Sequence, residues 1–236
     1  MENYLELLKQ DIRFVEGLKA CMNCGICTAI CPAAEFYDYD PRKIVDTVQK
    51  GDNDDIEKLL KSETIWYCGE CMSCKTRCPR GNTPALVVMS LRTLSQKLGF
   101  FTESEKGRQQ FAIKRTVGEN IFKYGYCVAT YAVRPDMHRE QGPVWQYILD
   151  NSRDIYERLG GKIDELGEGP LRKIPEDAKE ELRKIFEITG GTELFETIEV
   201  HSKKKAAEMG LQFDDEGIDN EYFIMTFTSS EKKHTY

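Results

Sequence analysis

Residues 21–32 are CMNCGICTAICP, and residues 68–79 are CGECMSCKTRCP. Each stretch has cysteines at its first, fourth, seventh and eleventh positions, and a proline follows the last cysteine directly. The two stretches hold eight of the nine cysteines in the 236-residue chain. Chance does not produce such a pattern twice, so the function of the chain is expected to depend on these two motifs.

The spacing CxxCxxCxxxCP is that of the bacterial run that binds iron-sulfur clusters. In that run, three cysteines hold one cluster and the fourth ligates the other cluster. The pattern therefore predicts two [4Fe-4S] clusters with exchanged ligands. The predicted ligand sets are Cys21, Cys24, Cys27 and Cys78 for the first cluster, and Cys68, Cys71, Cys74 and Cys31 for the second.

Glycine and proline fit this interpretation of the two motifs. Three thiolates two residues apart require a tightly coiled backbone, and we expect Gly25 and Gly69 to adopt the positive φ angles that such a coil needs. Pro32 and Pro79 favour an extended conformation for the preceding cysteine and remove an amide donor. Each proline is therefore expected to turn the chain away from its cluster.

Zinc and disulfide bonds are the alternative uses of these cysteines. Zinc also takes four thiolates, but its CxxC pairs are usually separated by a long gap, which three consecutive CxxC steps do not provide. Structural disulfides belong to oxidising compartments. The spacing favours iron-sulfur clusters over both.

The composition narrows the class of protein further. The chain has 33 basic and 40 acidic residues, a net charge of -7, which does not suit binding to the phosphates of a nucleic acid. No apolar run reaches the roughly 18 residues that a membrane-spanning helix requires. Residues 1–14 lack the basic and apolar regions of a signal peptide. We therefore expect no transmembrane segment and a cytoplasmic location.

Helical patterns surround both motifs, and no alternating strand pattern occurs in residues 1–100. Apolar residues recur at helical spacing over residues 1–19, and Asp40, Pro41 and Gly51 predict the start and end of another helix. Further helices are expected over residues 54–61 and 84–98. The prediction is a mainly α fold, with an α-helical ferredoxin domain carrying two [4Fe-4S] clusters in residues 1–100.

Residues 101–236 are predicted to form a helical extension that docks to other subunits. Helices are expected over residues 143–159, 175–188 and 192–209, with a long loop over residues 160–175 that is rich in glycine. The first of these helices is expected to bury Val144, Ile148, Ile155 and Leu159. Residues 222–228 are apolar and suit either a strand or a docking peptide. Residues 160–236 hold 18 acidic and 11 basic side chains, whereas residues 1–159 hold 22 of each.

Residues near the motifs resemble a known family. The resemblance rests on Ile65-Trp66-Tyr67-Cys68, Cys71, Cys74, Cys78-Pro79-Arg80-Gly81 and Leu91-Arg92. These residues resemble the C-type (HdrC-like) subunit of heterodisulfide reductase and its relatives in sulfur-oxidising organisms. The helical ferredoxin fold is also similar to the cluster domains of succinate dehydrogenase and anaerobic glycerol-3-phosphate dehydrogenase.

The resemblance implies an iron-sulfur subunit that passes electrons within a heterodisulfide reductase-like complex of thiol, disulfide or sulfur metabolism. Its implied partners are a catalytic B-type (HdrB-like) subunit and a flavin-bearing A-type (HdrA-like) subunit. The chain has no Cys-Cys-Gly of the catalytic partner and no GxGxxG nucleotide fingerprint, so no catalytic residue is predicted in it. The alternatives are a subunit of a quinone-linked, membrane-associated dehydrogenase and a cluster-bearing redox sensor.

Three further expectations concern single residues. Trp66 and Tyr67 are expected to shield the second cluster from water. Cys127, outside both motifs, is expected to be a buried structural thiol. The cations near the second motif, among them Arg77 and Arg80, predict a higher reduction potential for the second cluster, because the first motif has no charged side chain.

Overall fold

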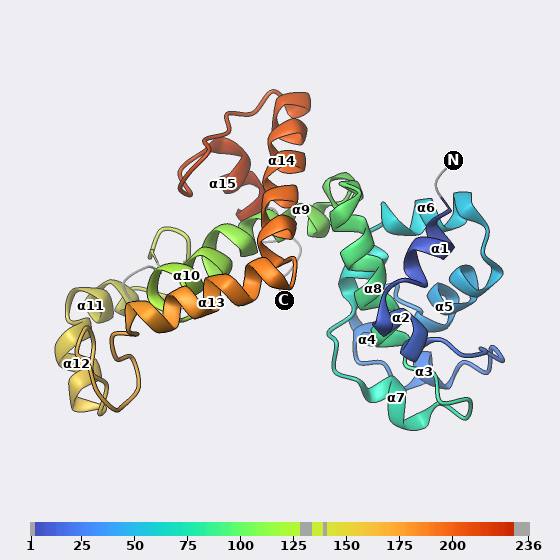
Figure 1. Ribbon diagram of the computed structural model, residues 1–236, viewed down its shortest axis with the longest axis horizontal. Coiled ribbons are helices and arrows are strands. Elements are labelled where there is room, and N and C mark those ends of the chain that lie inside the picture. Colours follow the sequence, from blue (N-terminus) through green and yellow to red (C-terminus); the bar gives the residue numbers. More distant parts are fainter. Residues whose placement is uncertain (1–2, 128–133, 139–140, 229–236) are drawn as a thin grey trace. The chain divides into compact units, whose positions relative to one another are not determined.

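The computed structural model describes residues 3–127, 134–138 and 141–228. All regular elements within these ranges are helices, which confirms the predicted mainly α fold (Figure 1). The chain divides into two compact units. We call Met1–Gln110 with Val200–Lys205 the cluster unit, and Phe111–Glu199 with Ala206–Tyr236 the C-terminal unit.

Short helices and turns make up the cluster unit. In chain order they are α1 (Tyr4–Leu8), α2 (Ile12–Gly17), α3 (Ile26–Ala29), α4 (Ala33–Phe36), α5 (Pro41–Lys50), α6 (Asn53–Leu60), the 3₁₀ helix η1 (Thr64–Tyr67), α7 (Ser73–Arg77), α8 (Pro84–Lys97) and the 3₁₀ helix η2 (Phe100–Glu103). Helix α9 (Glu105–Ile113) follows and runs into the C-terminal unit.

The N-terminal segment forms two helices where the sequence predicted one. The Asp11 side chain accepts the backbone N–H of Arg13 at 2.8 Å and caps α2, which separates this helix from α1. Leu8 is buried as the helical pattern predicted, but the side chains of Ile12 and Val15 are 68% and 49% exposed. Only part of the expected apolar stripe therefore faces the core.

Helix α5 begins and ends as the sequence predicted. The Asp40 carboxylate accepts the backbone N–H groups of Arg42 and Lys43, and Pro41 occupies the first turn, where no N–H partner is needed. Gly51 ends the helix with φ 73°, a left-handed conformation that glycine adopts without strain.

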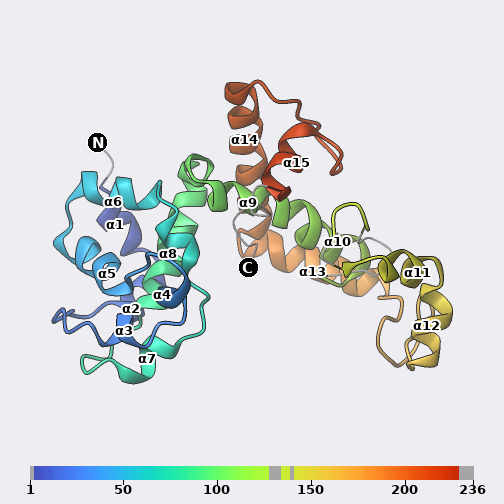
Figure 2. The ribbon, with the colours of Figure 1, turned by 180° about the vertical axis from the view of Figure 1, so that it is seen from behind.

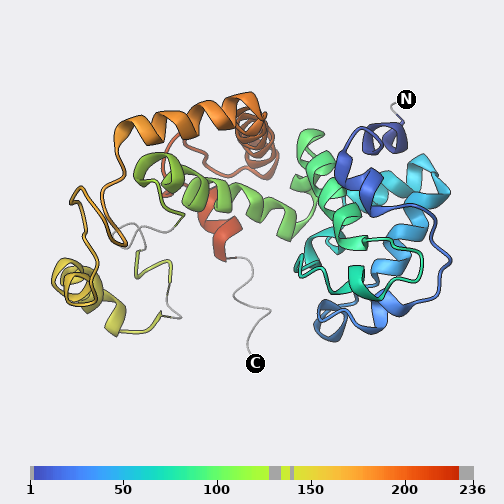
Figure 3. The same cartoon turned by 60° about the horizontal axis from the view of Figure 1, so that its bottom comes forward.

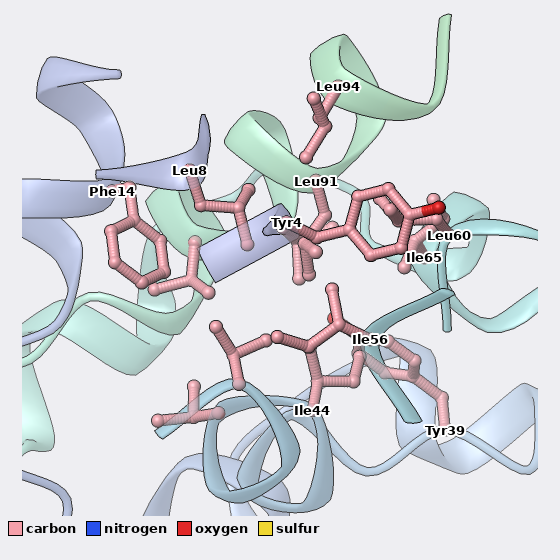
Figure 4. Close-up of a cluster of buried hydrophobic side chains, with 14 residues drawn as sticks. Tyr4, Leu8, Phe14, Tyr39, Ile44, Ile56, Leu60, Ile65, Leu91 and Leu94 are labelled. Carbon is pink, nitrogen blue, oxygen red and sulfur yellow. The ribbon is translucent and has the colours of Figure 1, made fainter. Parts of the chain in front are cut away.

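Helix α8 is the longest helix of the cluster unit and packs against α2, α5 and α6 (Figure 2). Its residues Val87, Val88 and Leu91 are fully buried. Removing each of these side chains from water stabilises the folded state by about 1.5–3 kcal/mol. Figure 4 shows Leu91 facing Leu8, Ile44 and the other apolar side chains of this core.

Gly17 lets α2 approach α8 closely. A Cβ atom at this position would lie 3.0 Å from the Leu86 Cβ and from the Val87 nitrogen. The Gly17 carbonyl accepts the backbone N–H of Thr83 at 2.8 Å, so the segment before the first motif is fixed to the start of α8. Thr83 directly precedes α8, and its side chain makes no capping hydrogen bond.

The C-terminal unit is also helical. It contains the π-helical turn η3 (Lys114–Gly118), α10 (Glu119–Tyr124), α11 (Val144–Asp150), α12 (Ser152–Arg158), α13 (Glu176–Ile188), most of α14 (Gly191–Met209) and α15 (Glu221–Thr228). Helices α10 and α13 lie side by side (Figure 3).

Two predictions for the C-terminal unit need correction. Residues 143–159 form two helices, and Val144 and Leu159, expected to be buried, are 60% and 75% exposed. Residues 222–228 belong to α15 and not to a strand. The Asn220 side chain accepts the backbone N–H of Phe223 at 2.9 Å and caps this helix.

Candidate iron-sulfur cluster site

The two cysteine motifs have the same backbone conformation. The second and fourth residues after the first cysteine have positive φ in both: Asn23 (61°) and Gly25 (81°) in one, Glu70 (53°) and Met72 (60°) in the other. A short helix, α3 or α7, follows each coil directly. The duplicated spacing therefore corresponds to a duplicated local structure.

The glycine prediction holds for the first motif and is wrong for the second. Gly25 has positive φ as expected, whereas Gly69 lies one residue too early and its φ is not positive. Glu70 and Met72 adopt the left-handed conformation instead, at a cost of about 1–2 kcal/mol each. The coil around the cysteines is thus kept in the second motif without glycine at either left-handed position.

Backbone amides point at the first cysteine of each motif. The Asn23 N–H donates to Cys21 Sγ, and the Glu70 N–H donates to Cys68 Sγ, both at 3.4 Å. In the second motif, hydrogen bonds with Ser73 lower the pKa of Cys71. Such bonds favour the deprotonated sulfur, which is the form that ligates iron.

One cavity gathers cysteines from both motifs. Cys21, Cys24 and Cys27 line it together with Cys78, the last cysteine of the second motif. The two motif helices α3 and α7 lie side by side, which places Cys78 next to the first coil (Figure 2). The four sulfurs predicted to hold the first cluster therefore share one cavity.

Cysteines predicted for the second cluster also lie near one another. Burial raises the pKa of the Tyr39 hydroxyl, and the neighbouring Cys68 and Cys31 raise it further. Burial likewise raises the pKa of Cys74, with smaller effects from Cys68 and Cys71. Tyr39 thus lies near both Cys31 of the first motif and Cys68 of the second.

The two coils also approach each other. Burial raises the pKa of Cys27 to about 11, and Cys21 and Cys74 contribute to the rise. In the part of the chain that the structure describes, no three cysteine, histidine or carboxylate side chains converge around a single metal ion.

Two amide side chains position the first coil. Gln49 of α5 accepts the backbone N–H of Cys21 at 2.6 Å and donates to the Cys21 carbonyl at 3.2 Å. Asn82 binds the preceding residues in the same way, accepting from Lys19 at 2.7 Å and donating to Ala20 at 3.2 Å. No pattern in the sequence signals either contact, because the partners are 28 and more residues apart.

One arginine positions the second coil. Arg92 of α8 donates from Nε to the Ile65 carbonyl at 2.7 Å and from Nη2 to the Cys68 carbonyl at 2.6 Å. Its Nη1 donates to the Glu70 carboxylate at 2.6 Å, and its guanidinium lies over the Trp66 ring. The planar fork of arginine makes these bonds from a single side chain.

We expect the variant Arg92→Lys to destabilise the second cluster. A lysine ammonium cannot reach three acceptors in this geometry, so the free energy of unfolding should fall by about 2–3 kcal/mol. Iron release to a chelator should be at least several-fold faster, measured by absorbance under anaerobic conditions. Arg77→Lys is the matched control, since Arg77 is exposed on α7. Equal release rates for the two variants would contradict this role of Arg92.

The distribution of cations around the cysteines differs from the one expected from sequence neighbours, which placed Arg77 and Arg80 beside the second cluster. Arg80, which follows the second motif, lines the cavity of Cys21, Cys24 and Cys27, and Arg42 lines the same cavity. In the second coil, Glu70 neutralises Arg92. Arg80 therefore does not favour a higher potential of the second cluster, because it lies beside the cysteines predicted for the first.

The aromatic residues before the second motif pack as a layer. Tyr67 stacks on Tyr37 with ring centroids 4.4 Å apart, and the Lys106 ammonium lies over both rings. Trp66 and Tyr67 both pack against the apolar core of the unit. The indole N–H of Trp66 is buried without an acceptor among the described residues.

Cys127, which the sequence predicted to be a buried thiol, is exposed.

Within the described ranges, no helix has the length and apolar character needed to cross a membrane.

Residues 17–82 match the family model of the 4Fe-4S dicluster domain. This match covers both cysteine motifs and the helices between them.

The chain is similar over half or more of its length to three curated relatives. It is 37% identical over 157 residues to the C subunit of the ferredoxin:CoB-CoM heterodisulfide reductase of Methanosarcina acetivorans, covering 66% of this chain and 60% of the relative. It is 32% identical over 122 residues to the second iron-sulfur C subunit of the CoB–CoM heterodisulfide reductase of Methanocaldococcus jannaschii, covering 52% and 58%.

The third relative is covered more fully. The chain is 34% identical over 174 residues to the iron-sulfur C subunit of the CoB–CoM heterodisulfide reductase of Methanopyrus kandleri, covering 74% of this chain and 73% of the relative. It spans about three fifths of the length of the other two relatives. With its duplicated motif, its helical fold and these relatives, the chain is an iron-sulfur protein that belongs to the family of heterodisulfide reductase C subunits.

Proposed function

We propose that the chain holds two [4Fe-4S] clusters with exchanged ligands. The proposed ligands are Cys21, Cys24, Cys27 and Cys78 for the first cluster, and Cys68, Cys71, Cys74 and Cys31 for the second. The observation that carries this proposal is the cavity that brings Cys78 to the three cysteines of the first motif. The nearness of Cys31 to Cys68 at Tyr39 supports the second set.

The surroundings of the cysteines fit such a group. Four thiolates around a cubane cluster leave a net negative charge, which cations and amide donors stabilise. Arg42 and Arg80 line the first cavity, and backbone N–H groups point at Cys21 and Cys68. The residues of the cluster unit thus position the thiolates and balance their charge.

We propose that the chain relays electrons inside a heterodisulfide reductase-like complex. When bound, the clusters would supply one-electron carriers. The names of the relatives describe ferredoxin-linked and CoB–CoM heterodisulfide reductases. By this likeness, the proposed partners are a flavin-bearing A-type subunit and a catalytic B-type subunit acting in thiol, disulfide or sulfur metabolism. Residues 1–100 would carry the clusters, and residues 101–236 would dock to the partners.

Anaerobic purification of the chain from its own cells tests this function. We expect about eight irons and eight sulfides per polypeptide, the content of two complete cubane clusters. Reduction should be reversible over repeated cycles by electron paramagnetic resonance, and A-type and B-type subunits should co-purify. A metal-poor chain would contradict the clusters, whereas a loaded chain that purifies with neither subunit would contradict the proposed complex.

A further inference from the structure

A second cavity lies in the C-terminal unit, away from all eight motif cysteines. Its volume is about 410 Å³, within the range of roughly 300–1,000 Å³ that small-molecule sites occupy. Buried Ile163 and the partly buried Leu171 and Ile174 form its apolar lining, and Tyr124 and Tyr126 add two aromatic side chains. These residues come from the end of α10 and from the segment that precedes α13.

Specific contacts hold this cavity in shape. The backbone N–H of Lys173 donates to the Glu165 carbonyl at 2.9 Å and closes the loop before α13. The Tyr126 hydroxyl donates to the Arg172 carbonyl at 2.9 Å and fixes the loop to the end of α10.

Gly125 makes the close approach of this loop possible. It has φ 78°, and a Cβ atom there would lie 2.5 Å from the Cγ1 of Ile174. Any other residue at this position would push the loop away from α10. The cavity is therefore built into the fold of the C-terminal unit.

Cations surround the cavity. Lys123, Arg172, Lys173 and Lys179 line it, against the single carboxylate of Asp164. Asp164 pairs with Arg153 at 3.3 Å, and Lys179 pairs with Glu176 at 2.7 Å.

The other three cations differ from Lys179 in their ion pairing. Among the residues that the structure describes, no carboxylate forms an ion pair with Lys123, Arg172 or Lys173. Within the described ranges, Arg172 donates only to the Gly169 carbonyl, at 3.4 Å, and the Lys123 ammonium lies over the Tyr124 ring. Residues 160–236 carry 18 acidic and 11 basic side chains, so this concentration of positive charge opposes the charge of its own region.

We infer that this cavity binds a small organic phosphate with a planar ring, a ligand of the mononucleotide class. Three cations without carboxylate partners suit a phosphate, which carries up to two negative charges, better than a carboxylate, which carries one. An arginine fork and lysine ammonium groups are the side chains that recognise phosphates. The apolar lining and the tyrosines provide the surface that a planar ring requires.

Calorimetric titration of the anaerobically purified, cluster-loaded full chain tests this inference. The probes are adenosine monophosphate, adenosine without the phosphate, and inorganic phosphate without the ring. We expect the nucleotide to bind at least tenfold more tightly than either fragment, and its affinity to fall as salt is added. Equal affinity for adenosine and the nucleotide, or no binding of the nucleotide, would overturn the inference.

Variants locate the binding site on the chain. The double variant Arg172→Gln with Lys173→Gln should weaken nucleotide binding at least tenfold. Lys184→Gln is the matched control, since Lys184 is an exposed lysine of α13 that does not line the cavity. Lys123→Gln adds a test on α10, outside the loop, and should weaken binding several-fold. An unchanged affinity in both cavity variants, or an equal loss in the control, would overturn the assignment. Iron content and circular dichroism of each variant verify that the fold is retained.

Discussion

Replacing Cys24 and Cys78 together by alanine is expected to remove one cluster and leave the other. Both residues belong to the ligand set proposed for the first cluster, so the second substitution removes no further cluster. The purified double variant should retain about four irons per chain, the content of one cubane cluster.

Replacing Cys24 and Cys31 together is expected to remove both clusters. These two cysteines belong to the same motif but, in the proposed arrangement, to different clusters. The iron content should fall from about eight towards zero, and the resonance signals of both reduced clusters should disappear. The two double variants thus differ by one complete cluster, although each removes two motif cysteines.

The comparison separates exchanged ligands from ligands kept within each motif. If each motif held its own cluster, Cys24→Ala with Cys31→Ala would leave four irons and Cys24→Ala with Cys78→Ala would leave none. That reversed result would contradict the proposed ligand sets. Cys127→Ala is the control for cysteine removal, because Cys127 is exposed and outside both motifs.

The parts of the cluster unit that sequence predicts are those set by neighbours along the chain. The cysteine spacing indicates the cofactor class because ligands of one coil must lie a fixed number of residues apart. The limits of α5 follow from Asp40, Pro41 and Gly51, which act within one helical turn of each end. These signals involve residues close together in the sequence, so they can be recognised without knowing the fold.

The parts that sequence missed depend on contacts between distant residues. Gln49, Asn82 and Arg92 position the two coils through backbone atoms that lie 24 to 63 residues away. Polar side chains of this kind are normally exposed, so composition gives no reason to select them. Met72 shows a related limit, because the second coil accepts a left-handed conformation at a residue that disfavours it.

The C-terminal unit shows the same limit for secondary structure. Residues 222–228 are apolar enough for a strand, and their periodicity does not distinguish a strand from a helix. The cap at Asn220 and the packing of Tyr222 and Phe223 against Phe111 determine the helix. Phe111 lies more than a hundred residues earlier in the chain, out of reach of any local pattern.

Replacing Arg115 by methionine is expected to destabilise the C-terminal unit severely. The Arg115 side chain is 0% exposed and binds both oxygens of Glu199 at 2.7 Å. It also donates to the backbone carbonyls of Asp214, Asp215 and Gly217 at 2.8–3.1 Å. Methionine fills a similar volume but offers no donor, so the Glu199 carboxylate and the three backbone carbonyls lose the bonds that Arg115 donates.

The expected loss is about 3–5 kcal/mol, the usual cost of removing one partner of a buried ion pair. Urea unfolding of the full chain followed by circular dichroism should show an earlier transition, while the iron content stays that of the wild type, because all eight motif cysteines belong to the cluster unit. Arg183→Met is the control. Arg183 is 42% exposed and pairs with Glu176 and Glu180, and its removal should cost less than about 1 kcal/mol.

A second variant separates the loss of the Arg115–Glu199 ion pair from the loss of the carbonyl bonds. Adding Glu199→Leu to Arg115→Met removes the carboxylate that the single change leaves behind, and should restore part of the lost free energy of unfolding. Recovery is incomplete because the three bonds from Arg115 to the carbonyls remain lost. Lys114, which binds Glu199 at 2.6 Å, also loses that ion pair and keeps its pair with Glu119 at 3.0 Å. A single variant that unfolds at the same urea concentration as Arg183→Met would contradict the role of Arg115 as the buried link between η3, α14 and the segment before α15.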